Sequence, residues 1–231
     1  MTPPIAAVLF DVGGPLSTEV EHERRVEGDI AVALAAEGVA VTAVDLARAS
    51  DVAVTSYAGD AYAAMIWWLA GRHRDRAARV FRRFQELAVV RPPMFELRPG
   101  IDALLAELHA RGLRLGLAAN QPTAMLAELD AAGIGQYFDH RQMSGHHGYR
   151  KPDPRVFIAA CAGLGVRPEH CVMVRDRIDN DIAPAKALGM RAVLFRTGRH
   201  IAQQPRSHAE VPDAEVREVG ELRRALGRLI D

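Results

Sequence analysis

Two aspartates of this sequence come just after apolar runs, where a parallel-sheet protein gathers the side chains of a ligand site. Asp11 ends the run at residues 5–10 and precedes a Gly-Gly-Pro turn. Asp176 stands just beyond the run at residues 171–174, and Asp181 lies slightly further along. Because carboxylate oxygens are ligands that magnesium prefers, these residues predict a Mg²⁺ site.

Three further polar residues are expected at the same place. Asn120 follows another apolar run, and Arg175 directly precedes Asp176. Lys151 stands in a loop between Asn120 and Arg175 in the chain. A lysine there supplies a fixed positive charge against a substrate phosphate. A metal ion and a lysine around one nucleophilic carboxylate suit phosphoryl transfer, which depends on positioning and on neutralising oxygen charge. The residue types therefore fit such a reaction, with one carboxylate as its nucleophile.

Strands that alternate with helices must bring these residues together. From residue 97 onwards, helical segments alternate with strand-like runs near residues 113–119, 137–138, 171–174 and 192–195. Loops are expected at 144–154 and 198–211, before a last helix near 219–229. This alternation predicts an α/β fold with a parallel sheet covered on both faces. Ligands of such sheets bind beyond the carboxyl ends of the strands.

Residues 17–93 have a different character and predict an inserted all-helical domain. Glycines separate four helix-forming segments, at residues 19–37, 43–57, 60–69 and 75–89. The insertion ends at the linker Arg91-Pro92-Pro93. The sheet domain is then formed by residues 1–16 and 94–231.

Composition and charge exclude several classes of partner. The 231 residues include 29 basic and 29 acidic side chains, so no net charge draws the chain to nucleic acid or to an anionic membrane. The most apolar helical piece, residues 61–70, is well short of the roughly 20 residues that cross a bilayer. Cys161 and Cys171 form no CxxC motif, which fits a reduced, cytoplasmic location. The sequence makes no prediction of oligomeric state.

Four motifs, in order, resemble those of the haloacid dehalogenase superfamily of aspartate-nucleophile hydrolases. They are Phe10-Asp11-Val12-Gly13-Gly14-Pro15-Leu16, Leu117-Ala118-Ala119-Asn120, Arg150-Lys151-Pro152-Asp153 and Asp176-Arg177-Ile178-Asp179-Asn180-Asp181. The match extends over almost the whole chain. It implies a Rossmann-like core with a helical cap inserted after the first motif.

The resemblance also implies roles for the candidate residues. Asp11 would be the nucleophile that becomes a phosphoaspartate, and Lys151 would neutralise both nucleophile and phosphate. Asn120 would help to position the phosphate or lie just behind it. Mg²⁺ would be held by Asp176 with support from Asp181, by Asp11 and by the backbone carbonyl of Gly13. The implied function is hydrolysis of a small phosphorylated metabolite.

Three residues depart from the family pattern. Phosphatases of this family usually have a second aspartate, the general acid and base, two positions after the nucleophile, where Gly13 stands here. General acid/base help is worth roughly 10²–10⁴-fold in rate, so its loss affects alkyl phosphates more than acyl phosphates. Ala119 replaces a Ser or Thr hydroxyl, and Arg175 replaces a glycine. Arg175 could donate to the phosphate, or pair with Asp176 or Asp179 and obstruct the metal.

Two other functions are compatible with the sequence. Gly13, Ala119 and Arg175 together are compatible with a catalytically impaired protein that has the same fold and serves to bind a ligand or to regulate a partner. A dehalogenase is a further alternative, because a halide also leaves without protonation. The Lys151 motif and the segment from Asp176 to Asp181 instead resemble the phosphatase branch, which binds a metal.

Overall fold

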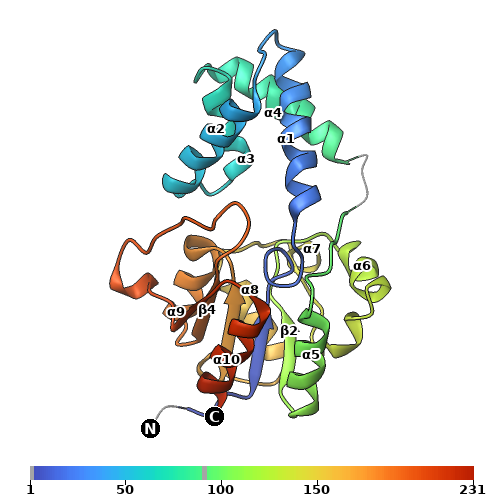
Figure 1. The fold of residues 1–231 in the computed structure, drawn as a ribbon, viewed down its shortest axis with the longest axis vertical. Coiled ribbons are helices and arrows are strands. Elements are labelled where there is room, and N and C mark those ends of the chain that lie inside the picture. Colours follow the sequence, from blue (N-terminus) through green and yellow to red (C-terminus); the bar gives the residue numbers. More distant parts are fainter. Residues whose placement is uncertain (1–2, 90–92) are drawn as a thin grey trace. The chain divides into compact units, whose positions relative to one another are not determined.

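The apolar runs form a five-stranded parallel sheet in the computed structural model, which describes residues 3–89 and 93–231 (Figure 1). The strand order is β2-β1-β3-β4-β5. The strands are β1 (Ala7–Phe10), β2 (Arg114–Leu117), β3 (Cys171–Arg175), β4 (Arg191–Phe195) and β5 (Ala214–Val216). The predicted α/β fold with a parallel sheet is confirmed.

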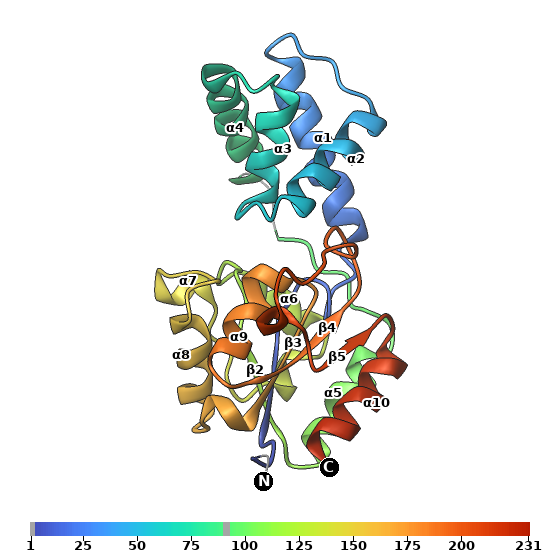
Figure 2. The same cartoon turned by 90° about the vertical axis from the view of Figure 1, so that its left-hand side faces the viewer.

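Helices cover both faces of this sheet (Figure 2). One face packs against α5 (Ile101–Ala110), α6 (Met125–Ala131) and α10 (Val219–Ile230). The other packs against α8 (Arg155–Gly163) and α9 (Ala183–Ala187). Successive residues of β1 alternate between the two cores, because side chains of a strand point to opposite faces.

The register of the strands decides which residues meet at the carboxyl edge. Phe10 of β1 pairs with Leu117 of β2 and with Val174 of β3. The next residues along β1 and β3, Asp11 and Arg175, therefore lie at the same level of the sheet. The backbone N–H of Asp11 also donates to the carbonyl oxygen of Val174 across 3.3 Å.

Four helices form a second compact unit. Close contacts divide the chain into Met1–Glu19 with Phe95–Asp231, and Val20–Met94. The second unit contains α1 (Val20–Ala35), α2 (Ala43–Thr55), α3 (Ala61–Leu69) and α4 (Arg74–Val89), which share their own apolar core. The sequence placed these boundaries after residues 16 and 93. Arg91 and Pro92 of the predicted linker lie outside the described residues, and a role of the helical unit as a cap stays a prediction.

Three details of the predicted fold are wrong. Gly135–Tyr137 forms a 3₁₀ turn, and the expected strand pairing occurs further on, as a single bridge between Gly116 and His140. Ser144–His147 forms a short helix, α7, within the predicted loop. Strand β5 was missed because it has only three residues, too few for an alternating pattern to be recognised.

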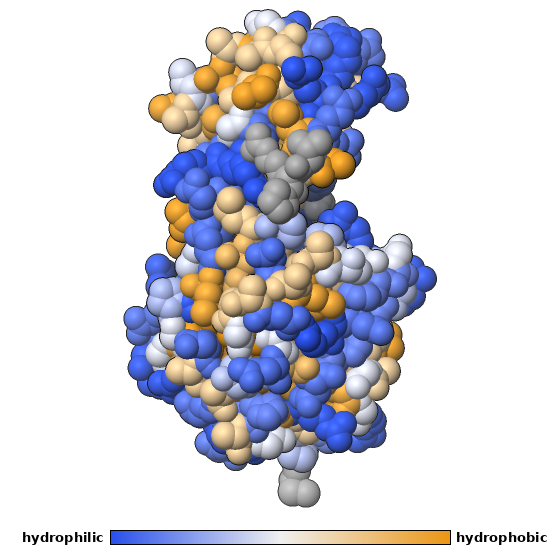
Figure 3. Space-filling model, turned by 90° about the vertical axis from the view of Figure 1, so that its right-hand side faces the viewer, coloured by the Kyte–Doolittle hydropathy of each residue, from blue (hydrophilic) through white to orange (hydrophobic). Residues whose placement is uncertain are grey.

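Hydrophilic and hydrophobic residues are interspersed over the face shown in Figure 3. Within residues 3–89 and 93–231, no helix is both long enough and apolar enough to span a bilayer.

The side chains of Cys161 and Cys171 are buried and form no disulfide, with their sulfur atoms 3.6 Å apart.

Close packing around β2 predicts the effect of adding one methyl group. A Cβ at Gly116 would lie 2.9 Å from side-chain carbons of both Leu9 and Leu164. We expect Gly116→Ala to lower the free energy of unfolding by about 1–3 kcal/mol, the usual cost of overpacking. Gly28→Ala, in a helix with nothing within 4 Å of the new Cβ, should instead raise it by about 0.5–1 kcal/mol. Urea unfolding followed by circular dichroism measures both, and effects of the same sign would contradict this account of the packing.

Candidate active site

Asp11 begins the tight turn that follows β1. Its carboxylate Oδ1 accepts a hydrogen bond from the N–H of Val12 at 2.8 Å, which orients the group. Gly14 has φ +82°, and a Cβ there would lie 2.9 Å from the carboxylate carbon of Asp176. Both the left-handed backbone and this close approach require glycine. Arg98 fixes the turn by donating from Nε to the carbonyl oxygen of Gly14 at 2.7 Å.

Lys151 reaches two of the predicted carboxylates. Its Nζ lies 3.2 Å from Oδ2 of Asp11 and 2.5 Å from Oδ1 of Asp181. The side chains of Lys151 and Asp181 are 0% exposed, so this pair is shielded from water. Burial lowers the pKa of Lys151 below its usual value, and the carboxylate of Asp181 opposes that shift. Lys151 therefore lies where it can neutralise charge on Asp11.

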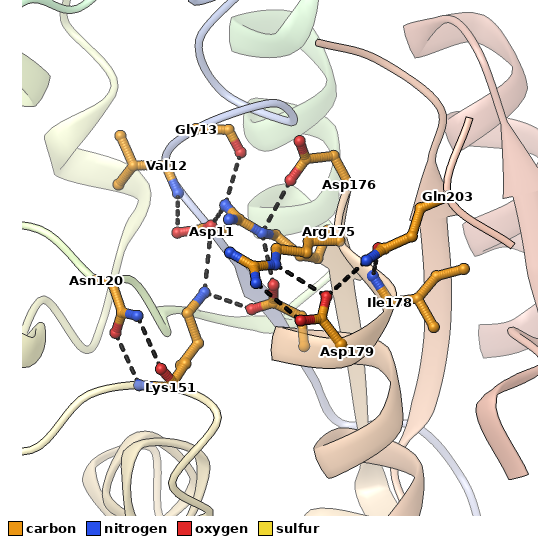
Figure 4. Close-up of polar contacts among 12 residues, drawn as sticks. Asp11, Val12, Gly13, Asn120, Lys151, Arg175, Asp176, Ile178, Asp179 and Gln203 are labelled. Atoms are coloured by element: carbon orange, nitrogen blue, oxygen red, sulfur yellow. Dashed lines mark hydrogen bonds and ion pairs between the residues drawn. The ribbon is translucent and has the colours of Figure 1, made fainter. Parts of the chain in front are cut away.

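Asn120 holds the backbone of Lys151 (Figure 4). Its Oδ1 accepts from the N–H of Lys151 at 2.8 Å, and its Nδ2 donates to the carbonyl oxygen of Lys151 at 3.0 Å. Asn120 also lines a pocket together with Ser144 and Arg150. Its contact in this structure is with the lysine loop, and a direct role in binding substrate stays a prediction.

Arg175 contacts all four groups that the sequence predicts as magnesium ligands. Asp11, Gly13 and Asp176 are labelled beside it in Figure 4. Its Nη1 donates to the carbonyl oxygen of Gly13 at 3.0 Å and forms an ion pair with Oδ2 of Asp11. Its Nε donates to Oδ2 of Asp181 at 2.7 Å and lies 2.9 Å from Oδ1 of Asp176. The guanidinium therefore takes the central position among these oxygens.

The position of Arg175 shows which of the two candidate carboxylates it contacts. Arg175 pairs with Asp176 and not with Asp179, whose carboxylate accepts hydrogen bonds from Arg177 at 2.8 and 2.9 Å. Gln203 also donates to Asp179, at 2.8 Å. The Asp179 cluster is thus a separate structural unit, and Arg175 belongs to the site around Asp11.

The oxygen donors have the right chemistry for Mg²⁺ but not the space. Magnesium demands near-ideal octahedral geometry with oxygens at about 2.0–2.1 Å, and the guanidinium of Arg175 already contacts each donor. In the part of the chain that the structure describes, no three His, Cys, Asp or Glu side chains are arranged to hold a metal ion. With Arg175 in place, these residues do not fit the ion.

The charged groups of the site are largely shielded from water. The side chains of Asp11 and Asp176 are 3% and 5% exposed, while Arg175 is 14% exposed. Burial raises the pKa of Asp176, and the guanidinium of Arg175 opposes that rise. Three carboxylates therefore face two cations in a site with little access to water.

Sequence reasoning missed two residues of the turn after Asp11. Arg98 lies far away in the chain, and nothing in its sequence context marks it as a partner of Gly14. Glu19 lies six positions after Gly13, yet its carboxylate reaches the place where a side chain of residue 13 would stand. Only the path of the turn reveals either contact.

Known proteins agree with this arrangement of fold and motifs. Residues 5–189 match the model of a family described as haloacid dehalogenase-like hydrolase. Since the match spans most of the chain, the protein belongs to this family of hydrolases.

Individual relatives are phosphatases. The chain is 35% identical over 125 residues to a glyceraldehyde 3-phosphate phosphatase of Methanopyrus kandleri, covering 54% of each chain. It is 36% identical over 126 residues to a phosphoserine phosphatase of Thermus thermophilus, covering 54% of this chain and 50% of the relative. The chain thus matches about half the length of these curated relatives. A solved structure of a phosphatase from Thermococcus onnurineus matches 96% of this chain and 98% of its own, with TM-score 0.59 and 25% identity.

Removing Arg175 should open a magnesium site. We expect isothermal calorimetry to detect no Mg²⁺ binding to the wild type at millimolar concentrations, and to detect binding to Arg175→Gly. Arg177→Gly, which removes a guanidinium paired with Asp179, should bind no more Mg²⁺ than the wild type. Tight binding to the wild type would contradict the central position assigned to Arg175.

The contact of Asn120 with the lysine loop predicts a loss of stability. Asn120→Ala leaves the N–H and C=O of Lys151 without these partners, and each unsatisfied buried group costs about 1–3 kcal/mol. Urea unfolding should therefore show a lower midpoint. An unchanged midpoint together with a raised KM would indicate instead that Asn120 acts mainly on substrate.

Proposed function

We propose that this protein hydrolyses a small phosphorylated metabolite through the carboxylate of Asp11. The observation that carries the proposal is the pair of cations, Lys151 and Arg175, that both reach Oδ2 of this buried carboxylate. Membership of the hydrolase family supports it. The magnesium dependence that the sequence predicts is not part of the proposal, because Arg175 takes up the oxygen donors.

The two cations offset the repulsion that opposes attack by a carboxylate on a phosphate. Asp11 would attack phosphorus and form a phosphoaspartate, which water then hydrolyses to restore the carboxylate. Fixed positive charges next to the transferred group stabilise the charge on its oxygens without reorganisation. Nη2 of Arg175 has no partner among residues 3–89 and 93–231, so it is available to donate to a phosphate oxygen.

The substrate class rests on the relatives. Their names give glyceraldehyde 3-phosphate and phosphoserine as substrates, which are small alkyl phosphates. We therefore propose a substrate of this size and type.

The free thiols of Cys161 and Cys171 fit the cytoplasm as the location of this protein, since reducing compartments keep such pairs of thiols from forming a disulfide.

Activity of Asp11→Asn tests the proposal. We expect the wild type to hydrolyse acetyl phosphate and p-nitrophenyl phosphate, and the variant to lose about 10⁴-fold or more of this rate, as removal of a covalent nucleophile does. Asp130→Asn, which changes an aspartate whose side chain is 54% exposed, should keep the wild-type rate. Excess chelator should leave the wild-type rate unchanged, because Arg175 supplies the cation.

Each contrary result has a distinct meaning. An Asp11→Asn variant with the wild-type rate would overturn the role of Asp11. A wild type that binds phosphate ligands without turning over any of them would favour the binding or regulatory alternative. Loss of activity in chelator with recovery in Mg²⁺ would overturn only the role of Arg175 as the resident cation.

A further inference from the structure

The space beside Gly13 is filled by the carboxylate of Glu19. A Cβ built on Gly13 would lie 2.4 Å and 2.8 Å from the two carboxylate oxygens of Glu19, and 2.7 Å from its carboxylate carbon. No real Cβ atom shows contacts this short, so a side chain at residue 13 and Glu19 in this position exclude each other. The carboxylate of Glu19 therefore occupies the space that a side chain of residue 13 would fill, although residue 13 is a glycine.

The turn after β1 brings Glu19 to this place. The N–H of Ser17 donates to the carbonyl oxygen of Val12 at 3.0 Å, and Gly13 and Ser17 form a bridge. Glu19 then adopts φ +59°, a left-handed conformation that is uncommon for a residue with a side chain. Such strain persists only where the surrounding structure fixes it, and it is concentrated at functional sites.

Arg98 links this carboxylate to the rest of the site. Its guanidinium donates to the carbonyl oxygens of Gly14 and Ser17, at 2.7 and 3.3 Å, and so spans the turn. Burial lowers the pKa of Arg98, and the negative charges of Asp176 and Glu19 oppose that shift. The carboxylates of Glu19 and Asp176 therefore both lie within electrostatic reach of one partly buried cation.

We propose that Glu19 is the general acid and base of this hydrolase, in place of the aspartate that the family resemblance expects at residue 13. The inference rests on the proposed function of Asp11. It follows from position, because the Glu19 carboxylate occupies the side-chain space two residues after the nucleophile. Glu19 would contact the leaving oxygen and thus act as a catalytic residue.

Each step balances in atoms and electrons. As a carboxylate oxygen of Asp11 forms its bond to phosphorus, the P–O bond of the ester breaks with its electron pair on oxygen, and the protonated Glu19 gives its proton to that oxygen. The products are an alcohol, phosphoaspartate and ionised Glu19. The Glu19 carboxylate then takes a proton from water as the water oxygen attacks phosphorus. The P–O bond to Asp11 breaks, which restores Asp11 and protonated Glu19 and releases phosphate.

Substrates with different leaving groups test this role. We expect Glu19→Gln to lower kcat/KM for an alkyl phosphate such as phosphoserine by about 10²–10⁴-fold, and kcat/KM for acetyl phosphate by less than about tenfold. The reason is that kcat/KM reports formation of the phosphoaspartate, in which acetate leaves without protonation, and not the later hydrolysis that both substrates share. Glu107→Gln, in α5, changes a carboxylate that pairs with Arg223 and is 40% exposed, and it should change neither rate. Thermal unfolding checks that each variant is folded.

Moving the carboxylate gives a second and independent test. Gly13→Asp alone should not raise the turnover of alkyl phosphates, because Glu19 already supplies a carboxylate in the space that the new side chain would enter. The double variant Gly13→Asp with Glu19→Ala should hydrolyse alkyl phosphates at least about tenfold faster than Glu19→Ala alone, since a carboxylate returns to the same space.

The outcomes separate this inference from the proposed function. Equal losses of kcat/KM for both substrates in Glu19→Gln, or no recovery in the folded double variant, would overturn the role of Glu19 and leave that of Asp11 intact. A wild type without turnover of any phosphate would overturn the proposed function, and the role of Glu19 with it.

Discussion

The structure of this site depends on the guanidinium of Arg175 among four oxygen donors. Asp11, Asp176 and Asp181 are almost wholly buried, and ionised groups are stable inside a protein only when they are paired. Arg175 reaches all three carboxylates and the carbonyl of Gly13, and Lys151 reaches two of the same carboxylates. Arg175 and Lys151 thus offset two of the three negative charges of this cluster without a metal ion.

The register of the sheet explains why an arginine can take this role. Phe10 and Val174 are paired on β1 and β3, so the next residues, Asp11 and Arg175, lie side by side. A planar guanidinium carries five N–H donors and can contact several carboxylates at once. A glycine at residue 175, which the family pattern expects, would leave that space open. One substitution at a strand end therefore changes the kind of cation that the site holds.

Much of the fold and part of the site could be predicted from the sequence. Buried runs that end at Asp11 and near Asp176 marked the strands and the edge where ligands bind, because apolar runs and strand ends have a simple relation to the sheet. The position of Lys151 followed from the order of the motifs. The partners of Arg175 could not be predicted, because a long side chain at a strand end can reach several neighbours. The position of Glu19 could not be predicted either, because it depends on a left-handed residue after a turn that no periodicity reveals.

The central claim is that Arg175 occupies the space of the magnesium ion, and a crystal structure grown with millimolar Mg²⁺ and inorganic phosphate tests it most directly. The account predicts density for the guanidinium between Asp11, Gly13, Asp176 and Asp181, with phosphate within hydrogen-bond distance of Arg175. Density for an octahedral ion at about 2.0–2.1 Å from Asp11 and Asp176, with Arg175 turned away from them, would contradict it.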